Sequence, residues 1–416
     1  MPIPPADIHD AVASRLDEAR QVLADLIATP SLSGEEAAAM DLAADAFARV
    51  ADVERVPMDD ALRDDKDYSD VIDGITYSGR DNLRVVLPGG GGEGLLLNTH
   101  IDTVPPSQGQ AAPFDPRLID GALWGRGACD AKGQVATIFL TMAALRSLGA
   151  APAGDLVAHV VVEEENGGNG SLAMVRRGER AGGCVVLEPT DRRILTSIRG
   201  AIWFAITLRG RPGHSGEAGG TRSALTMAVR VIEILEGYHA RLLAASRGDP
   251  MFDKFDNPMP LTVGKLHAGN WPATAPGEAV LAGVLGLLPN TTAREVMDGL
   301  TEAIRREGGA AIAENMDIHF TYRHDASVCP TDHPVVTALA AAVRGTGDEP
   351  AIDAMTASCD AWLYNNQLAI PTVVFGGGSL SVAHGNGEHM PLAELAAAAE
   401  TLTALALRGC GPESPC

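Results

Sequence analysis

Five potential metal-binding side chains occur at the ends of separate β-rich runs, and this feature constrains the fold of the chain more than any other. Apolar runs at 95–97, 160–162 and 185–187 lead into three of them. Open parallel sheets present functional groups outside the carboxyl ends of their strands, so we expect all five segments to converge on one metal site. The five are two imidazoles and three carboxylates: His100, Asp130, Glu165, Glu188 and His384.

The order of apolar patterns predicts an α/β protein with a mostly parallel sheet. Helical apolar spacing alternates with short β-rich runs, as in βαβ units. We expect helices at about 6–28, 34–50 and 133–147, and strands at 84–87, 95–98, 156–162 and 185–187. The same alternation resumes near the end, with a helix at 333–344, a strand at 372–375 and a closing helix from 392.

Between these parts, the pattern predicts a second, inserted domain. Its order is strand, helix, strand, strand, helix, strand, at 201–208, 223–241, 261–266, 279–288, 292–306 and 317–322. This βαββαβ order is typical of a small independent layer. We therefore expect a discontinuous catalytic, metal-binding domain of residues 1–196 and 326–416, interrupted by an inserted domain of residues 197–325.

Composition narrows the possible partners. The chain has 416 residues, 46% of them apolar, and a formal charge of −22 from 54 acidic and 32 basic residues. Nucleic acid and anionic membranes are therefore not expected as partners, because both bind clustered Lys and Arg. No apolar run approaches the roughly 20 residues that span a bilayer, and the N-terminus lacks a leader pattern, so we expect a cytoplasmic protein.

The six cysteines are scattered and include no C-x-x-C pair. Neither a disulfide scaffold nor a structural zinc ribbon is expected. Cys129 and Cys359 each precede an aspartate and could lie near the metal site. Packing as buried thiols is the role that we expect for them.

The donor set has a definite chemistry. Imidazoles and carboxylates suit Zn²⁺ and accept Co²⁺ or Mn²⁺, and five donors with one shared can hold two ions. Asp102, two residues beyond His100 on an extended segment, is placed to fix the tautomer of that imidazole. If the segment through Glu164 and Glu165 is extended, adjacent side chains point in opposite directions. One can then bind metal while the other accepts a proton from a water molecule.

Each element also has an ordinary structural interpretation when it is taken alone. An isolated H-x-D is often a coincidence, and the glutamates at 163–165 could form a solvated acidic corner. Glu188 before a proline could cap a turn, and His384 could belong to a polar loop. Only the joint occurrence of these residues, in this order and next to β-rich runs, favours a metal site.

Several short motifs surround the candidate ligands. They are His100–Pro105, Trp124–Gly133, Glu164–Glu165 with Gly167 and Gly170, Glu188–Thr190, Gly213–Ser215, and Ala383–His384 with Glu388. Together these motifs resemble those of the M20 metallopeptidase family, which includes acetylornithine deacetylase, succinyl-diaminopimelate desuccinylase, aminoacylase and glutamate carboxypeptidase. The resemblance extends from Thr29 to the last helix.

This resemblance implies a zinc-peptidase-like α/β domain with an inserted ferredoxin-like lid that forms a homodimer. Asp130 would bridge two ions, with His100 and Glu188 completing one site and Glu165 and His384 the other. It also implies a cis peptide between Asp130 and Ala131. Two catalytic roles follow as well: Glu164 would be the general base, and His214 in the lid would stabilise the oxyanion, usually in the partner subunit.

The chain departs from the family pattern in the lid. Many members carry an asparagine and an arginine that bind the substrate carboxylate, and Ala273 and Gly286 occupy those places here. Glycine cannot replace a bidentate arginine, so we expect substrates without an α-carboxylate to be accepted at least as well as those with one. The remaining anion contact would come from the amides at 376–378, which could equally form only a tight turn.

The sequence therefore predicts a dinuclear metal-dependent amidohydrolase of the deacylase type, acting on a small N-acyl compound. A dipeptidase or carboxypeptidase is the alternative among enzymes. A non-catalytic binding module with the same fold is the alternative from another class. The presence of Glu164 together with all five potential ligands favours catalysis.

Overall fold

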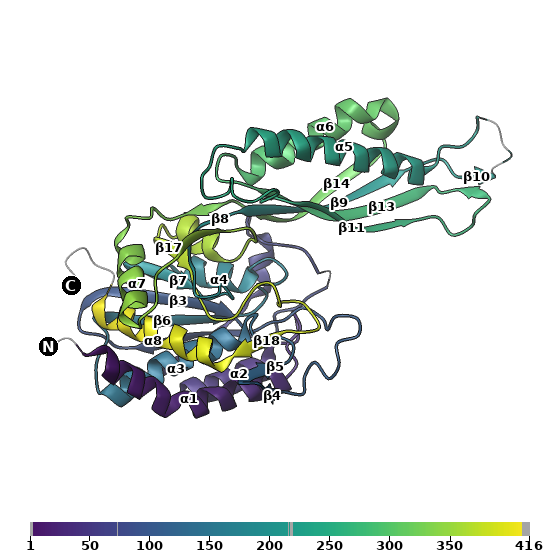
Figure 1. The fold of residues 1–416 in the computed structure, drawn as a ribbon. Coiled ribbons are helices and arrows are strands. Elements are labelled where there is room, and N and C mark those ends of the chain that lie inside the picture. Colours follow the sequence, from purple (N-terminus) through teal and green to yellow (C-terminus); the bar gives the residue numbers. More distant parts are fainter. Residues whose placement is uncertain (1–2, 73, 215, 217–218, 410–416) are drawn as a thin grey trace.

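Two β-sheets, each with its own helices, dominate the computed structural model, which describes residues 3–72, 74–214, 216 and 219–409 (Figure 1). A nine-stranded sheet is built from the N-terminal and C-terminal parts of the chain, and a four-stranded sheet from the segment between β8 (Ile194–Ile198) and β15 (Ser327–Val328). Ser215, Cys410 and Cys416 lie outside the described residues. Within the described residues, no helix is long and apolar enough to cross a membrane.

The nine-stranded sheet is parallel at its centre and antiparallel toward its edges. Its order is β1-β2-β6-β3-β7-β17-β8-β15, and β16 pairs with β8. β6, β3, β7 and β17 run parallel, whereas β1, β2 and β15 pair antiparallel with their neighbours. The strands are β1 Asp52–Pro57, β2 Asp81–Leu87, β3 Gly92–His100, β6 Gly154–Val161, β7 Gly183–Val186, β8 Ile194–Ile198, β15 Ser327–Val328, β16 Ile352–Met355 and β17 Thr372–Val374.

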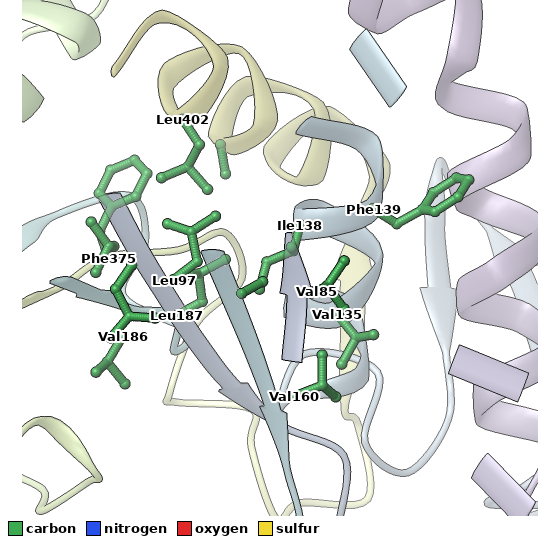
Figure 2. Close-up of a cluster of buried hydrophobic side chains, with 14 of the residues drawn as sticks. Val85, Leu97, Val135, Ile138, Phe139, Val160, Val186, Leu187, Phe375 and Leu402 are labelled. Atoms are coloured by element: carbon green, nitrogen blue, oxygen red, sulfur yellow. The ribbon is translucent and has the colours of Figure 1, made fainter. Parts of the chain in front are cut away.

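The central strands form because their residues are apolar on both faces. All of β7 and the last six residues of β3 are buried, as expected for strands that helices cover on both sides. Figure 2 shows side chains of the strands, among them Leu97 and Val160, packed beside Ile138 of α3 (Lys132–Leu148) and Leu402 of α8 (Leu392–Arg408). This core fixes the carboxyl ends of the parallel strands relative to one another.

Helices cover both faces of this sheet. α1, α3 and α8 pack against one another on one face, and α4 lies on the other (Figure 1). α3 ends at Leu148, and the left-handed backbone of the following Gly149 (φ 60°) is a usual way to terminate a helix. The helices are α1 Pro5–Ala28, α2 Ala37–Phe47, α3 Lys132–Leu148, α4 Asn169–Arg177, α7 Pro334–Gly345 and α8 Leu392–Arg408.

The four-stranded sheet is antiparallel throughout, in the order β11-β13-β9-β14. Alternate residues of β9, including Ile202 and Phe204, are buried in a separate core beneath α5 and α6. The strands of this sheet and the helices α5 and α6 follow one another along the chain in the predicted order of strand, helix, strand, strand, helix, strand. The elements are β9 Gly200–Arg209, α5 Ala224–Ala245, β11 Leu261–Ala268, β13 Glu278–Leu287, α6 Ala293–Ala313 and β14 Met316–His324.

Two smaller sheets complete the described structure. β10 (Gly213–His214) pairs with β12 (Thr274–Ala275) at the tip of the four-stranded sheet that is distant from the nine-stranded sheet (Figure 1). β18 (His389–Pro391), β5 (Ala122–Trp124) and β4 (Arg117–Ile119) form a three-stranded sheet.

Apolar patterns predict the long elements and miss several short ones. β1, β8, β16 and α4 have no counterpart among the predicted elements. Most residues of β1 are exposed, which removes the apolar signal of a strand. The acidic, polar segment 59–72 has no apolar period and would be expected on the surface, yet Tyr68 and Ser69 within it are buried. Their burial depends on contacts with distant parts of the chain, which local periodicity does not report.

Candidate metal centre

The five predicted ligands lie at one edge of the nine-stranded sheet. His100 is the last residue of β3, and Glu165 and Glu188 follow the carboxyl ends of β6 and β7. Asp130 stands two residues before α3, and His384 lies in the loop between β17 and β18. Because β3, β6 and β7 are adjacent and parallel, their carboxyl ends face the same side of the sheet.

The carboxylate of Asp130 lies between the two histidines. Nε2 of His100 is 3.1 Å from its Oδ1, and Nε2 of His384 is 3.3 Å from its Oδ2. Nε2 of His384 is also 3.0 Å from Oε1 of Glu165, and Nε2 of His100 is 4.0 Å from Oε1 of Glu188. Potential ligand atoms of His100, Asp130 and Glu165 all lie within 4.8 Å of one another. Each imidazole therefore faces a different oxygen of one carboxylate.

The electrostatics of this cluster fit a bound cation. Burial, reinforced by Asp130 and Glu165, raises the pKa of Glu188 well above its usual range. Burial opposes the ionisation of Asp130, but hydrogen bonds from His100 and His384 outweigh it and lower that pKa. The hydrogen bond to Asp130 is the largest cause that raises the pKa of His384 to about 10. Several buried carboxylates next to imidazoles are the donors that a divalent ion needs, and its charge would offset their repulsion.

Asp102 connects the two sides of the site. Its Oδ1 and Oδ2 accept hydrogen bonds from the backbone N–H groups of Glu164 and Glu165, each at 3.1 Å. Nδ1 of His100 lies 3.3 Å from Oδ1 of Asp102 and 2.9 Å from its backbone oxygen. The hydroxyl of Ser33 donates to Oδ2 at 2.8 Å. One buried carboxylate therefore holds both the imidazole and the backbone that carries the adjacent glutamates.

The sequence allows an extended backbone through Glu163, Glu164 and Glu165. In the structure this backbone is not extended. Glu163 has a φ of 60°, and the next residues form a turn before α4. The reason is the burial of Glu163, whose carboxylate forms an ion pair with Arg80 and accepts a hydrogen bond from the Tyr77 hydroxyl at 2.9 Å. The separation of Glu164 from Glu165 therefore comes from a turn and not from strand alternation.

A second buried pair supports the loop that carries His384. Nη1 of Arg126 lies 2.5 Å from Oε2 of Glu388, and both side chains are fully buried. Nη2 of Arg126 donates to the backbone oxygen of His384 at 3.3 Å. Oε1 of Glu388 accepts from the backbone N–H of Asp130 at 3.3 Å. The peptide between Asp130 and Ala131 is cis, which confirms that expectation.

Sequence reasoning missed one acidic residue beside the site. Asp360 is buried, and burial raises its pKa to about 7. Its charge interacts with His100 and Asp102, so it lies near the cluster. The available signal was the position of Asp360 after a β-rich run that ends at Met355, which is too short to stand out. The preceding Cys359 is buried, as expected, and so is Cys129.

Two predicted features are not part of this cluster. His214 is exposed in β10 at the far tip of the four-stranded sheet (Figure 1). The amides at 376–378 were considered as an anion site, but the N–H of Gly376 donates to Thr190 Oγ1 at 3.1 Å and that of Gly378 to Glu394 Oε2 at 2.7 Å. These two amides are already engaged, which favours the tight-turn interpretation.

Comparisons with known proteins agree with this geometry. The model of peptidase family M20/M25/M40 matches residues 96–408. A succinyl-diaminopimelate desuccinylase of Methylobacterium radiotolerans is 27% identical over 89% of this chain and 91% of its own. An N-formyl-4-amino-5-aminomethyl-2-methylpyrimidine deformylase of Bacillus subtilis is 27% identical over 72% of this chain and 76% of its own. The structure of the di-peptidase Dug1p of Saccharomyces cerevisiae superposes with a TM-score of 0.77 at 13% identity, covering 98% of both chains.

Proposed function

This chain belongs to peptidase family M20/M25/M40, whose members hydrolyse amide bonds with a metal, and on that premise we propose that it is a dinuclear deacylase of a small N-acyl compound. The observation that carries the proposal is the position of Asp130, with one carboxylate oxygen toward His100 and the other toward His384. Such a carboxylate can bridge two ions. The names of the relatives, a desuccinylase and a deformylase, favour removal of a small acyl group.

The family resemblance suggests how the ligands would divide between two ions, and the measured distances support this division. His100 and Glu188 would hold one ion, and Glu165 and His384 would hold the second. Asp130 would be a ligand of both ions. Zn²⁺ suits this mixture of imidazoles and carboxylates best, and Co²⁺ or Mn²⁺ could replace it. Bound ions would supply the acidification of a water molecule and the polarisation of the scissile carbonyl.

The remaining chemistry belongs to side chains of this protein. Glu164 would accept the proton of the attacking water and later deliver it to the leaving amine. Asp102 holds the backbone N–H groups of Glu164 and Glu165, so it would keep the base and the neighbouring ligand in fixed positions. His214 would donate a hydrogen bond to the oxyanion. Since His214 lies at the far tip of the four-stranded sheet, we propose that it acts in the site of a second copy.

In the proposed dimer, the two parts of the chain would have different roles. Residues 1–196 and 326–416 would form the catalytic domain, and residues 197–325 a ferredoxin-like lid through which a cytoplasmic homodimer forms. The exposed edge strand β11 and the exposed side chains Leu225 and Val229 of α5 support an interface on this lid.

Metal reconstitution tests the proposal. After loading with Zn²⁺ and dialysis, we expect about two divalent ions per chain and hydrolysis of N-acetyl or N-formyl compounds that a chelator abolishes. Asp130→Ala should lose both ions, because each loses a shared ligand. Hydrolysis of dipeptides but not of acyl amines would indicate a dipeptidase. Tight metal binding without hydrolysis of any amide would indicate a binding module and contradict the proposal.

A further inference from the structure

The 246–260 segment joins α5 to β11 and packs against both large sheets. Its side chains Phe252 and Met259 are fully buried. They form a separate apolar cluster with Leu288, which follows β13, and with Ala354 of β16 in the nine-stranded sheet. The 246–260 segment is therefore a buried contact between the two sheets, in addition to the two points where the chain itself passes between them.

An ion pair lies beside this apolar cluster. Asp353 of β16 is 3% exposed and forms ion pairs with Lys254 of the segment and with Arg193, which precedes β8. Its Oδ1 also accepts a hydrogen bond from the backbone N–H of Ala354 at 2.8 Å. A buried carboxylate is stable only with such partners. Lys254 therefore adds a charged contact between the segment and β16 next to the apolar one.

Hydrogen bonds within the four-stranded half of the molecule fix the shape of the segment. The guanidinium of Arg247 donates to the backbone oxygens of Phe255, at 2.9 Å, and Asp256. Nε2 of His239, in α5, lies 3.0 Å from the backbone oxygen of Met259. The segment is therefore a bonded structure that can hold one sheet in position relative to the other.

The opposite edge of the four-stranded sheet, β14, has its own contacts with the rest of the chain. The N–H of Asp70 donates to the Thr321 oxygen at 2.8 Å, and Nη2 of Arg323 donates to the Tyr68 oxygen at 2.6 Å. The 246–260 segment leads into β11, which is the other edge strand. Without this segment, the sheet would be supported along one edge and could rotate about that edge.

A small rotation at the base of the four-stranded sheet becomes a large displacement at its tip. β9 has 10 residues, so at about 3.3 Å per residue it is about 30 Å long. A rotation of about 10° at the base would move β10 by about 5 Å. Reacting groups must be held within about 0.5 Å, and an error of about 1 Å can reduce a rate about 100-fold. His214, in β10, therefore needs a fixed angle between the sheets.

We propose that the 246–260 segment fixes this angle, and that Phe252 and Lys254 are thereby positioning residues for His214. Phe252 supplies the apolar contact between the sheets, and the ion pair of Lys254 prevents the segment from sliding along β16. The inference rests on the proposed role of His214 in the site of a second copy. It assigns a role in the reaction to side chains that lie far from β10, at the other end of the four-stranded sheet.

Distances between spin labels test the fixed angle without turnover. One label is attached at Ala311→Cys, an exposed position near the tip, because the following β14 begins opposite the end of β9. The other is attached at Arg344→Cys, an exposed position on α7. Cys410 and Cys416 are replaced by serine, and the four other cysteines are buried. Labelled chains are diluted with excess unlabelled chains, so each measured distance lies within one chain.

We expect one narrow distance distribution in the wild-type background. Phe252→Ala and Lys254→Met should broaden it by several ångströms, because the sheet can then rotate about its β14 edge. Lys254→Arg keeps the charge and should keep the distribution narrow. An unchanged width in both Phe252→Ala and Lys254→Met would overturn the inference.

Kinetics on a small N-acetyl substrate test the connection to His214. We expect kcat to fall by about 10- to 100-fold in Phe252→Ala, and by less in Lys254→Met, with little change in KM. In a His214→Ala background the same substitutions should cause no further loss, because the side chain that they position is absent. Equal losses in the two backgrounds would overturn the positioning role.

Two control variants change the four-stranded half without changing the segment. Arg294→Met removes an exposed charge on α6, and Leu300→Ala removes a buried side chain from the core beneath α6. Both should keep the narrow distribution and the wild-type kcat. If Phe252→Ala does not fold, Lys254→Met decides, because it leaves Asp353 paired with Arg193.

The two measurements separate this inference from the proposed function. Absence of hydrolysis by the metal-loaded wild type contradicts the proposed hydrolase, and the label distances still decide whether the segment fixes the angle. Hydrolysis together with an unchanged distance distribution in the variants contradicts only the role of the 246–260 segment.

Discussion

Glu163, Glu164 and Glu165 are consecutive in the sequence and occupy three different environments. Glu163 is buried against Arg80, and Glu165 lies 3.0 Å from the His384 imidazole. Burial is the main cause that raises the pKa of Glu164 well above its usual range. Since hydrogen bonds to Asp102 fix the backbone of Glu164 and Glu165, conservative changes at these positions should have separable effects.

We expect Glu164→Gln to retain both ions and to lose activity by about 10² to 10⁴-fold, the contribution of a positioned general base. Glu165→Gln should instead weaken metal retention, because an amide is a poorer ligand than a carboxylate. Metal content after dialysis and kcat on the same preparations check this pair. The opposite behaviour of the two variants would shift the assignment of base and ligand by one residue.

Arg80 holds two carboxylates in the interior. Its side chain is 5% exposed, and its partners Glu36 and Glu163 are fully buried. Arg80→Met leaves both carboxylates without a cation, so we expect the free energy of unfolding to fall by about 3 to 5 kcal/mol. Urea denaturation measures this change. Arg294→Met is the exposed control, and an equal effect of both variants would contradict the buried role.

The turn that carries Glu164 depends on a strand from the four-stranded sheet. Nε2 of His324, in β14, donates to the Gly167 oxygen at 3.2 Å. The His324 ring lies between those of Tyr322 and Trp362, with centroid distances of 4.0 and 4.5 Å. The four-stranded sheet therefore supports the turn directly at its base, and the neutral form of His324 is the one that this packing accommodates.

Acid should weaken this junction. Burial lowers the pKa of His324 to about 3, compared with about 6.5 for an unfolded histidine. Between these two pKa values the unfolded chain binds one proton more than the folded chain. The contribution of neutral His324 to the free energy of unfolding is therefore complete above about pH 6.5 and is lost as the pH falls toward 3. We expect the free energy of unfolding of the wild type to decrease more steeply than that of His324→Gln, by up to about 1.4 kcal/mol per pH unit.

Urea unfolding between pH 7 and pH 4, in the presence of a chelator, measures this difference. His267→Gln, at an exposed position of β11, is the matched control and should follow the wild type. If the free energy of unfolding changes with pH equally in the wild type and in His324→Gln, then His324 is protonated to the same extent in the folded and unfolded states, which would contradict this prediction.

The position of His214, far from the candidate ligands, requires an explanation. The candidate metal centre lies at the edge of the nine-stranded sheet, and β10 lies at the far tip of the four-stranded sheet (Figure 1). A histidine so placed can contribute to catalysis most simply in a second subunit, and a two-fold interface would supply this contact twice.

Complementation measures this exchange. His214→Ala and Glu164→Gln chains should each be strongly impaired alone. If His214 acts in the partner subunit, a mixed dimer collects both defects in one site and leaves the other intact. Random pairing makes about half of the dimers mixed, so roughly a quarter of all sites should regain activity. No recovery in verified mixed dimers would place His214 in the site of its own chain.

Much of the fold follows from local patterns. The lengths of α1, α3 and α8 follow from apolar spacing, and the fully apolar runs of β3 and β7 predict central parallel strands. Edge strand β1 and the short strands β8 and β16 could not be predicted in this way. Their residues are exposed or too few to give a period, and they are strands only because a neighbour supplies hydrogen bonds.

The candidate donor residues could be named from the sequence, because ligand chemistry depends on residue type and strand ends share one edge of a parallel sheet. Contacts between distant segments set the details around them. Glu163 turns inward because its carboxylate pairs with the buried Arg80. This contact joins residues far apart in the chain, where no local pattern records which charged groups will pair.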